Sequence, residues 1–367
     1  MKKPRVAIVH DFLMQHGGAE NVTLAFLEMF PEAPLYTLFY DLQRVGKEFQ
    51  GREIRTSFLQ KMPFPRGKYQ WVLPLMGLAT ETFDFSSFDV VLSSSNVHSK
   101  GIIVPEHTTH IAYCHTPARY LWTESASYVK NLRYPSFVKP AIIAHLSKLR
   151  IWDYLAAQRP DIFLANSQFV QKRIKKYYGR ESTVVYPPLS LENFCLGKGD
   201  GSYFLIGGRM VAYKKFDLAI RAFNRLRTKL KVFGEGPFLP VLQKIAGPNI
   251  EFLGKVSGEE KNKLFGGARA FLFPQVEDFG ITAIEAMATG RPVIAYRAGG
   301  VKETILEGIT GEFFDYDEWE ALADAVVRFD EHKYNPETIR AHALSFRKER
   351  FHDEIQKIID EIWKTKI

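Results

Sequence analysis

Short apolar runs alternate with helical patterns along the chain. The first run, residues 5–10, is followed by a glycine-bearing loop and by apolar positions at helical spacing over residues 19–30, which Pro31 ends. The same order returns at residues 203–206, with Gly207-Gly208 behind the run and a helical pattern over residues 218–226. Because a strand, a glycine loop and a helix open each half, the pattern predicts an α/β protein with two doubly wound domains.

Further strand-sized runs follow in each half, and helical patterns separate many of them, which favours parallel sheets. The linker is marked by Pro187-Pro188 and by the glycine-rich residues 197–201, so we expect domains over residues 1–188 and 189–345. The last stretch, residues 346–367, has an amphipathic helical pattern. The further runs are residues 90–92, 110–113, 162–165, 184–186, 230–233, 250–253, 270–273 and 293–296.

Composition adds the class of protein and its compartment. Of 367 residues, 46% are hydrophobic and 25% charged, the balance of a folded protein. No apolar run reaches the roughly 18 residues that cross a bilayer, and the first run is too short for a signal peptide. The two cysteines, Cys114 and Cys195, lie far apart, so we expect no disulfide framework and a cytoplasmic location.

The net charge of +8 lies entirely in the first half. Residues 1–190 hold 23 basic and 15 acidic residues, whereas residues 191–367 hold 26 of each. This excess indicates an anionic partner for the first half, either a phosphorylated lipid at a membrane surface or nucleic acid, or it only keeps the protein soluble. Residues 58–78 and 130–150 mix basic, aromatic and aliphatic positions, a pattern typical of a membrane interface and also of solvated helix faces.

Two carboxylates eight positions apart follow the run at residues 270–273. Glu277 lies in a loop, and Glu285 lies about one turn into the predicted helix. The start of a helix presents unpaired N–H groups that suit an anion, and Gly280 lets a ligand approach the backbone closely. The two acids can accept hydroxyl groups from two parts of one long ligand, such as a sugar and a ribose. Alternatively, the acids at residues 277 and 278 only stabilise the start of the helix.

Two cations follow the run at residues 203–206. Arg209 and Lys214 are five positions apart, before the next predicted helix, and Lys215 is adjacent to Lys214 and can take its place. Such a pair can clamp a diphosphate and can stabilise the charge that grows on a leaving diphosphate. The alternative is a solvated, basic helix start.

These segments resemble a known family. Residues 275–290 are similar to the E-x7-E motif of family 4 of the retaining glycosyltransferases, which have the GT-B fold of two Rossmann-like domains facing across a cleft. The resemblance spans residues 5 to about 330. Three further motifs occur in the family's order: Gly17-Gly18-Ala19-Glu20, the stretch from Gly208-Arg209 to Lys214-Lys215-Phe216-Asp217, and Gly234-Glu235-Gly236-Pro237.

The resemblance implies transfer of a hexose with retention of configuration and without metal or cofactor. It places the nucleotide sugar on the second domain and the acceptor on the first, with the final helix packing back on the first domain. His115, in Tyr-Cys-His-Thr-Pro, is expected to orient the hexose. The implied catalytic residues are His115, Arg209, Lys214 and Glu277, and the implied donor-binding residues are Gly17, Gly18, Arg209, Lys214, Lys215, Gly234, Glu277, Phe279, Gly280, Ile281, Thr282 and Glu285.

The motifs look most like mannosyltransferases of surface-polysaccharide (O-antigen) synthesis. The resemblance therefore favours GDP-mannose as donor, with a UDP-sugar as the alternative, and a glycan or polyprenyl-diphosphate-linked sugar as acceptor. Peripheral contact with the inner face of a membrane fits the basic first half.

Two other classes are weighed. A nucleotide-sugar epimerase or phosphorylase can share the fold, and a nucleic-acid-binding protein fits the basic half but lacks its usual motifs, so we expect no nucleic acid partner. Asp315-Tyr316-Asp317 matches the D-x-D of metal-using transferases, but the spacing of Asp317 and Glu320 predicts a helix cap instead.

Overall fold

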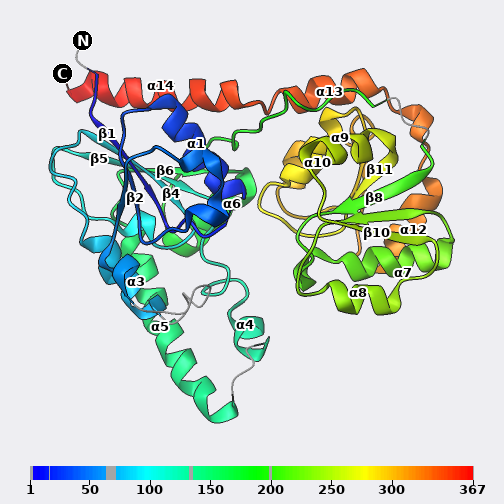
Figure 1. Ribbon diagram of the computed structural model, residues 1–367, viewed down its shortest axis with the longest axis horizontal. Helices are drawn as coiled ribbons and strands as arrows, with labels where there is room; N and C mark the ends of the chain where they lie inside the picture. The colour runs from blue at the N-terminus through cyan, green and yellow to red at the C-terminus, as the bar shows by residue number, and fades with distance from the viewer. Residues whose placement is uncertain (1–2, 16, 63–71, 132–134, 198–200, 367) are drawn as a thin grey trace. The chain divides into compact units, whose positions relative to one another are not determined.

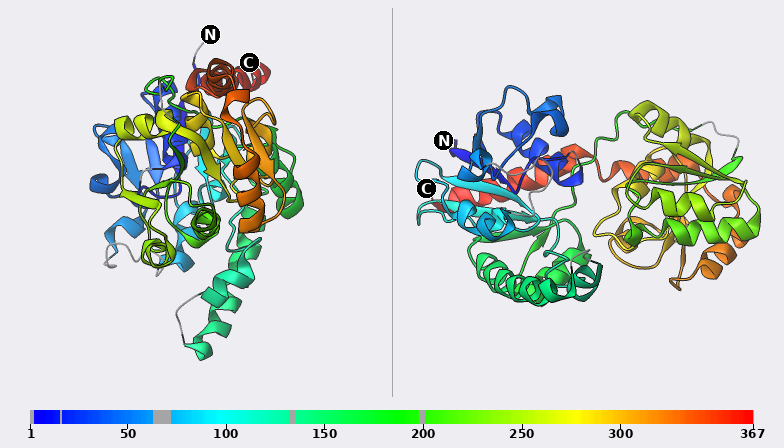
Figure 2. Two further views of the ribbon diagram at one scale, coloured as in Figure 1. Left: turned by 90° about the vertical axis from the view of Figure 1, so that its right-hand side faces the viewer. Right: turned by 60° about the horizontal axis from the view of Figure 1, so that its bottom comes forward.

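The computed structural model describes residues 3–15, 17–62, 72–131, 135–197 and 201–366. By its internal contacts the chain divides into two compact units, Met1–Pro188 with Phe351–Ile367, and Leu189–Arg350. Each unit is built on one sheet whose strands all pair in parallel, with helices on both faces (Figures 1 and 2). Parallel strands buried on both faces explain why the strand segments are continuous apolar runs.

The first unit has a seven-stranded sheet in the order β3-β2-β1-β4-β5-β6-β7. Alternate residues of β1 face opposite layers: Ile8 packs with α1 and α14, whereas Val9 packs with Phe85 and Ile102. The strands are β1 (Val6–His10), β2 (Leu35–Thr37), β3 (Ile54–Thr56), β4 (Val90–Ser95), β5 (Thr109–Cys114), β6 (Ile162–Ala165) and β7 (Thr183–Val184). The α-helices of its main segment are α1 (Gly18–Met29), α2 (Leu42–Val45), α3 (Leu73–Glu81), α4 (Ser125–Asn131), α5 (Lys139–Ala156) and α6 (Gln168–Tyr178).

The second unit has a six-stranded sheet in the order β10-β9-β8-β11-β12-β13. Helices α7, α8 and α12 cover one face, and α9, α10 and α13 cover the other (Figure 1). The strands are β8 (Tyr203–Gly207), β9 (Leu230–Phe233), β10 (Ile250–Gly254), β11 (Ala268–Phe273), β12 (Val293–Tyr296) and β13 (Gly311–Phe314). The α-helices are α7 (Phe216–Leu226), α8 (Leu239–Ile245), α9 (Gly258–Gly267), α10 (Ile281–Ala288), α11 (Val301–Thr304), α12 (Trp319–Arg328) and α13 (Pro336–Leu344).

The last helix, α14 (Lys348–Lys366), returns the chain to the first unit. Phe351, Ile355 and Ile359 are buried in the core that α1 and the sheet of that unit form. Their spacing of four residues puts them on one side of the helix, as the amphipathic pattern requires. Within the described ranges, no helix combines the length and the apolarity needed to cross a bilayer.

The structure corrects some of the predicted elements. Three strands, β2, β3 and β13, lie where we predict none. The strand β7 is Thr183–Val184, so the predicted run at residues 184–186 contributes only Val184 to the sheet. The predicted cap at Asp317 is wrong, because α12 begins at Trp319 with Glu318 as its N-cap and no side-chain hydrogen bond there. Asp317 instead accepts a hydrogen bond from Lys215 Nζ at 2.9 Å.

Candidate functional site

The strand order of each sheet reverses at one point. In the second unit β8 lies between β9 and β11, and in the first unit β1 lies between β2 and β4. Loops that leave the carboxyl ends of such neighbouring strands diverge to opposite faces and open a crevice, where open parallel sheets bind ligands. The residues that follow β8, β11, β1 and β4 are therefore the first candidates for a site.

In the second unit an ion pair joins the loops behind β8 and β11. Lys214 lies in the single turn η6 (Ala212–Lys214), and its Nζ is 2.8 Å from Oε1 of Glu277. Both side chains are largely buried, with 14% and 18% exposed. Arg209, in the same loop as Lys214, is exposed, and its side chain makes no hydrogen bond or ion pair with another described residue. Lys214 and Glu277 thus meet at the switch point, and Arg209 lies in the same loop as Lys214.

Glycines bring backbone close together around this ion pair. Gly234 has φ 112°, and a Cβ there would lie 1.9 Å from the carbonyl oxygen of Gly208. Gly280 has φ 96° and is the N-cap of α10, where no side chain occupies the capping position. Ile281 and Thr282 form the first turn of that helix. The start of α10 therefore has backbone N–H groups that no capping side chain satisfies, which suits an anionic ligand.

The second acid of the E-x7-E motif has its own lysine. Nζ of Lys261, on α9, is within hydrogen-bonding distance of Oε2 of Glu285. We do not predict Lys261 from the sequence, because it lies on a different helix and no motif marks it. Lys215, in contrast, does not join the ion pair, since it contacts Asp317. The ring of Phe279 is buried and packs 5.8 Å from that of Phe346.

In the first unit His115 follows β5 directly. Its Nε2 lies 2.9 Å from Oγ of Ser94, and its ring meets Tyr113 edge to face at 5.3 Å. Burial is the main reason that the pKa of His115 is lowered to about 4, so the ring is neutral at pH 7. Gly17 is the N-cap of α1 and Gly18 its first residue, behind β1.

Asp11, directly after β1, is a site residue that the sequence does not reveal. Its carboxylate accepts hydrogen bonds from the N–H groups of four consecutive residues, 96–99, at 2.6 to 2.9 Å. Burial alone would raise the pKa of Asp11, but His98, His10 and these N–H groups together hold it below its ordinary value. Asp11 thereby fixes the loop behind β4 at the switch point.

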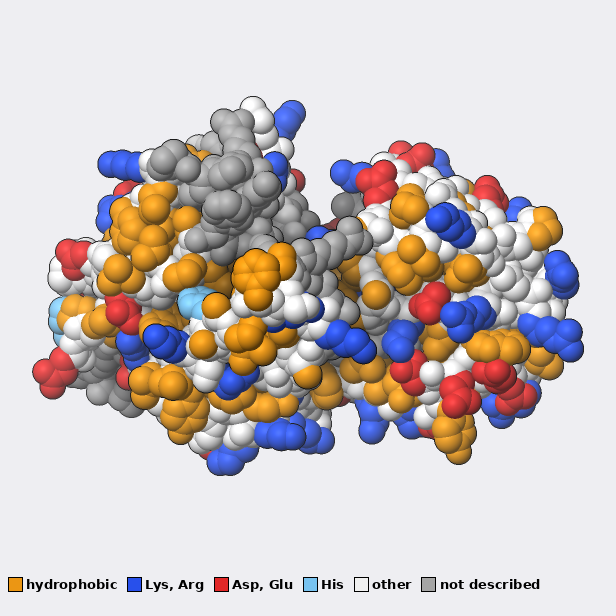
Figure 3. Space-filling model, turned by 90° about the horizontal axis from the view of Figure 1, so that it is seen from below, with side chains coloured by type: hydrophobic (Ala, Val, Ile, Leu, Met, Phe, Trp, Pro, Cys, Tyr) orange, Lys and Arg blue, Asp and Glu red, His pale blue; other side chains and the backbone are white. Residues whose placement is uncertain are grey.

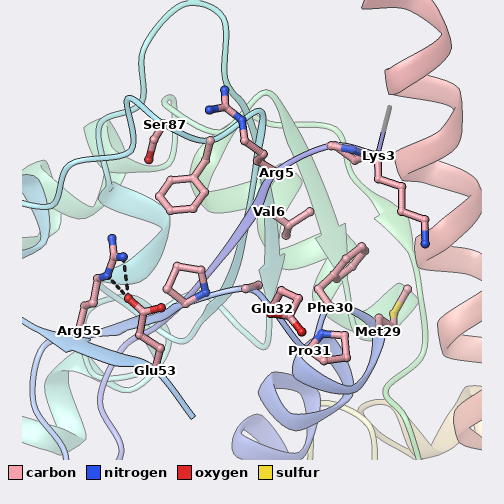
Figure 4. A pocket seen from close by; sticks show the side chains of 14 residues that line it. Lys3, Arg5, Val6, Met29, Phe30, Pro31, Glu32, Glu53, Arg55 and Ser87 are labelled. Carbon is pink, nitrogen blue, oxygen red and sulfur yellow. Dashed lines mark hydrogen bonds and ion pairs between the residues drawn. The ribbon is translucent and has the colours of Figure 1, made fainter. Parts of the chain in front are cut away.

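A separate pocket lies at the opposite edge of the same sheet, at the amino ends of β1 to β4. It encloses about 630 Å³ and includes Lys3, Arg5, Glu53 and Arg55 (Figure 4). Arg55 pairs with Glu53 at 2.6 Å and Arg5 with Asp89 at 3.1 Å, so neighbouring carboxylates already neutralise both guanidinium groups. This edge lacks the diverging loops of a switch point.

Comparison with known proteins agrees with these observations. Residues 193–343 match the family described as glycosyl transferases group 1. The chain is 34% identical over 148 residues to a GDP-mannose-dependent alpha-(1-6)-phosphatidylinositol monomannoside mannosyltransferase of Mycolicibacterium smegmatis, which covers 35% of this chain and 39% of that protein. It is 24% identical over 379 residues to an alpha-1,3/1,6-mannosyltransferase of Candida glabrata, over 83% of this chain and 78% of that protein.

The alignments with two of the curated relatives span only 39% and 50% of those proteins.

Solved structures resemble the fold over nearly the whole chain. The Anabaena protein HepE in complex with UDP and glucose has a TM-score of 0.72 at 16% identity, and covers 98% of this chain and 100% of its own. A sucrose-phosphate synthase from Thermosynechococcus elongatus has a TM-score of 0.73 at 16% identity with the same coverage. The chain therefore has the two Rossmann-like domains of the GT-B fold, and its residues 193–343 match the glycosyl transferases group 1 family.

Proposed function

We propose that this chain is a retaining, metal-independent glycosyltransferase that moves mannose from GDP-mannose to a glycan or lipid-linked sugar acceptor in polysaccharide biosynthesis. The observation that carries the proposal is the Lys214–Glu277 ion pair, with the exposed Arg209 in the loop of Lys214, at the switch point of a group 1 domain. Both mannosyltransferase relatives support mannose as the sugar, and the name of one specifies GDP-mannose as its donor.

The proposed chemistry uses cations in place of a metal. Arg209 and Lys214 bind the diphosphate and stabilise its charge as the bond between C1 of the sugar and the phosphate oxygen breaks. The acceptor hydroxyl forms its bond to C1 on the same face, and its proton passes to an oxygen of the departing phosphate. Glu277 and Glu285 accept hydroxyl groups of the hexose and the ribose, and no protein nucleophile forms a covalent bond. A glycosyl adduct trapped on Glu277 would contradict this route.

The donor is tested by titrating the full chain calorimetrically with GDP and UDP, followed by slow sugar release from a panel of GDP- and UDP-sugars. We expect tighter binding of GDP and release from GDP-mannose, both unchanged when EDTA is present. Tighter binding of UDP would assign the enzyme to UDP-sugars, and loss of release in EDTA that Mg²⁺ restores would refute metal independence.

A membrane partner is proposed for the first unit. Every large hydrophobic side chain that is exposed in its described part lies on or beside five elements that contact one another: η2 (Phe58–Lys61), α3, η4 (Ser99–Gly101), η5 (Ser136–Val138) and α5. The start of α5 projects from the body of the unit (Figures 1 and 2), and the surface over these helices shows hydrophobic side chains among Lys and Arg (Figure 3). Residues 63–71 and 132–134 of the two basic stretches lie outside the described residues.

The charge of α5 favours an anionic lipid surface. The helix contains Lys139, Lys148 and Arg150, and its single acidic residue, Asp153, is buried and paired with Lys100. Basic residues around exposed aliphatic and aromatic side chains bind the interface of an anionic bilayer.

Flotation with vesicles tests the membrane contact. We expect the chain to float with phosphatidylglycerol vesicles but not with phosphatidylcholine, and the double substitution Ile151→Ser with Leu155→Ser to abolish flotation. Val327→Ser, at an equally exposed position on α12, is the control and is expected to float normally. Flotation that survives the double substitution would refute this surface.

A further inference from the structure

A set of buried hydrogen bonds lies behind His115. Oγ of Ser94 is 2.9 Å from Nε2 of His115, 3.3 Å from the carbonyl oxygen of Ala19 and 3.1 Å from Nδ1 of His10. Ser94 is completely buried, and only 2% of His10 is exposed. Because these side chains are buried, we expect their hydrogen bonds to be made within the protein.

The hydroxyl hydrogen of Ser94 has two acceptors within reach, the carbonyl oxygen of Ala19 and Nε2 of His115. The carbonyl oxygen can only accept, and we infer that Ser94 donates to it. Thr23 also donates to the Ala19 carbonyl, at 3.2 Å, and therefore gives no hydrogen to His10. Nδ1 of His10 lies 3.1 Å from the carbonyl oxygen of Ser94, so this nitrogen carries a hydrogen. The other ring nitrogen, Nε2, lies 3.8 Å from the buried carboxylate of Glu20. Ser94 Oγ is left as an acceptor for both rings.

His115 consequently carries its hydrogen on Nε2. Because burial keeps the ring neutral at pH 7, it has one hydrogen only, and Nδ1 then has a free lone pair. Among the described residues Nδ1 of His115 has no hydrogen-bond partner, and 9% of the residue is exposed. The nitrogen that remains for a ligand is thus an acceptor, which suits a hydroxyl group and not a carbonyl or phosphate oxygen.

We propose that Ser94 is a positioning residue that holds His115 as the Nε2–H tautomer, so that Nδ1 accepts a hydrogen bond from a hydroxyl of the donor hexose. The identity of the ligand rests on the proposed function, whereas the tautomer does not. Ser94 acts through His115 and touches no substrate itself.

Nitrogen NMR on the ligand-free full chain tests the tautomer directly. With ¹⁵N-histidine labelling, long-range correlations separate a protonated ring nitrogen from a bare one, and His115→Gln identifies the resonances by their loss. We expect a bare Nδ1 for His115 in the natural protein, and a mixture of tautomers in Ser94→Ala. A protonated Nδ1, or spectra that Ser94→Ala leaves unchanged, would overturn the proposal.

Ser93 provides a matched control. It is equally buried on β4, and its Oγ lies 2.8 Å from Nε2 of a second buried histidine, His110. Ser93→Ala therefore removes the same kind of hydrogen bond away from His115. We expect it to change the resonances of His110 and to leave those of His115 unaltered.

Kinetics test the role in catalysis. Ser94→Ala is expected to lower kcat for hexose release by about 3- to 10-fold with GDP affinity unchanged, since one buried hydrogen bond is lost. Ser94→Thr, which keeps the hydroxyl, should recover part of the loss, and Ser93→Ala should show none. Full activity of Ser94→Ala would refute the positioning role. An inactive natural protein with the expected tautomer would refute the proposed function alone.

Discussion

Replacing Lys214 by alanine tests the proposed diphosphate site most directly. The ammonium group of Lys214 is largely buried and is held 2.8 Å from Glu277, so it is already oriented before a ligand arrives. A hydrogen bond between charged groups in such a setting contributes about 1.5 to 3 kcal/mol to binding. Its loss should therefore raise the Kd for GDP by about 10- to 150-fold.

The same substitution has a second effect through Glu277. Without Lys214 its carboxylate has lost its ion-pair partner and repels the incoming diphosphate. At an effective dielectric constant of 20, two like charges about 6 Å apart repel by about 3 kcal/mol. Adding Glu277→Gln to Lys214→Ala should thus restore part of the affinity, so that the double variant binds GDP more tightly than the single one.

Calorimetric titration at constant ionic strength measures these affinities. Lys263→Ala is the matched control, because Lys263 lies on the exposed surface of α9, 2.7 Å from Glu259, and its removal changes the net charge equally. We expect the control to bind GDP within about twofold of the natural protein. If Lys214→Ala also binds within twofold, with an unchanged unfolding temperature, the diphosphate does not bind at this junction and the reasoning fails.

Two further predictions concern Lys261 and the buried histidines. Lys261→Ala should remove the ion-pair partner that holds Glu285. We therefore expect the ratio of the Kd for 2′-deoxy-GDP to the Kd for GDP to fall towards one, while Lys263→Ala leaves this ratio unchanged. An unaltered ratio in Lys261→Ala would contradict the ribose contact. Burial is the largest cause that lowers the pKa values of His98, His110 and His115, to about 4, 3 and 4, so the unfolded chain takes up protons from pH 6.5 downwards while the folded chain does not. The free energy of unfolding should therefore fall by up to about 4 kcal/mol per pH unit between pH 6 and 4.5, and thermal unfolding that is as stable at pH 5 as at pH 7.5 would refute this.

Local sequence predicts the buried central strands well. The runs at residues 162–165, 230–233 and 293–296 have the bounds of β6, β9 and β12. Apart from Lys231 these segments are apolar, and turn residues or a helix follow them, which favours the strand interpretation. β2, β3 and β13 have only three or four residues, and β13 starts with Gly311 and contains Glu312. Their pairing with a neighbouring strand, which the local pattern does not contain, makes them strands.

The partners within the site are harder to predict than its residues. The resemblance draws attention to Lys214, Glu277 and Glu285, but the ion pairs with Glu277 and Lys261 depend on which loops meet in space. Ser94 lies in a run of three serines, residues 93–95. The sequence of this strand does not indicate that Ser93 and Ser94 contact two different histidines. The wrong cap at Asp317 has the same origin, because Lys215 reaches that carboxylate from another loop.

The two switch points differ in the charge of the side chains that we propose as ligand contacts. In the second unit the site contains two oppositely charged pairs, and Arg209 adds a positive charge that no described side chain pairs with. A ligand can therefore gain net attraction only if it is anionic. In the first unit Ser94, His10 and His115 are buried, and the low pKa of His115 keeps that ring neutral at pH 7. Such a neutral ring contributes direction and not charge, which suits a hydroxyl group.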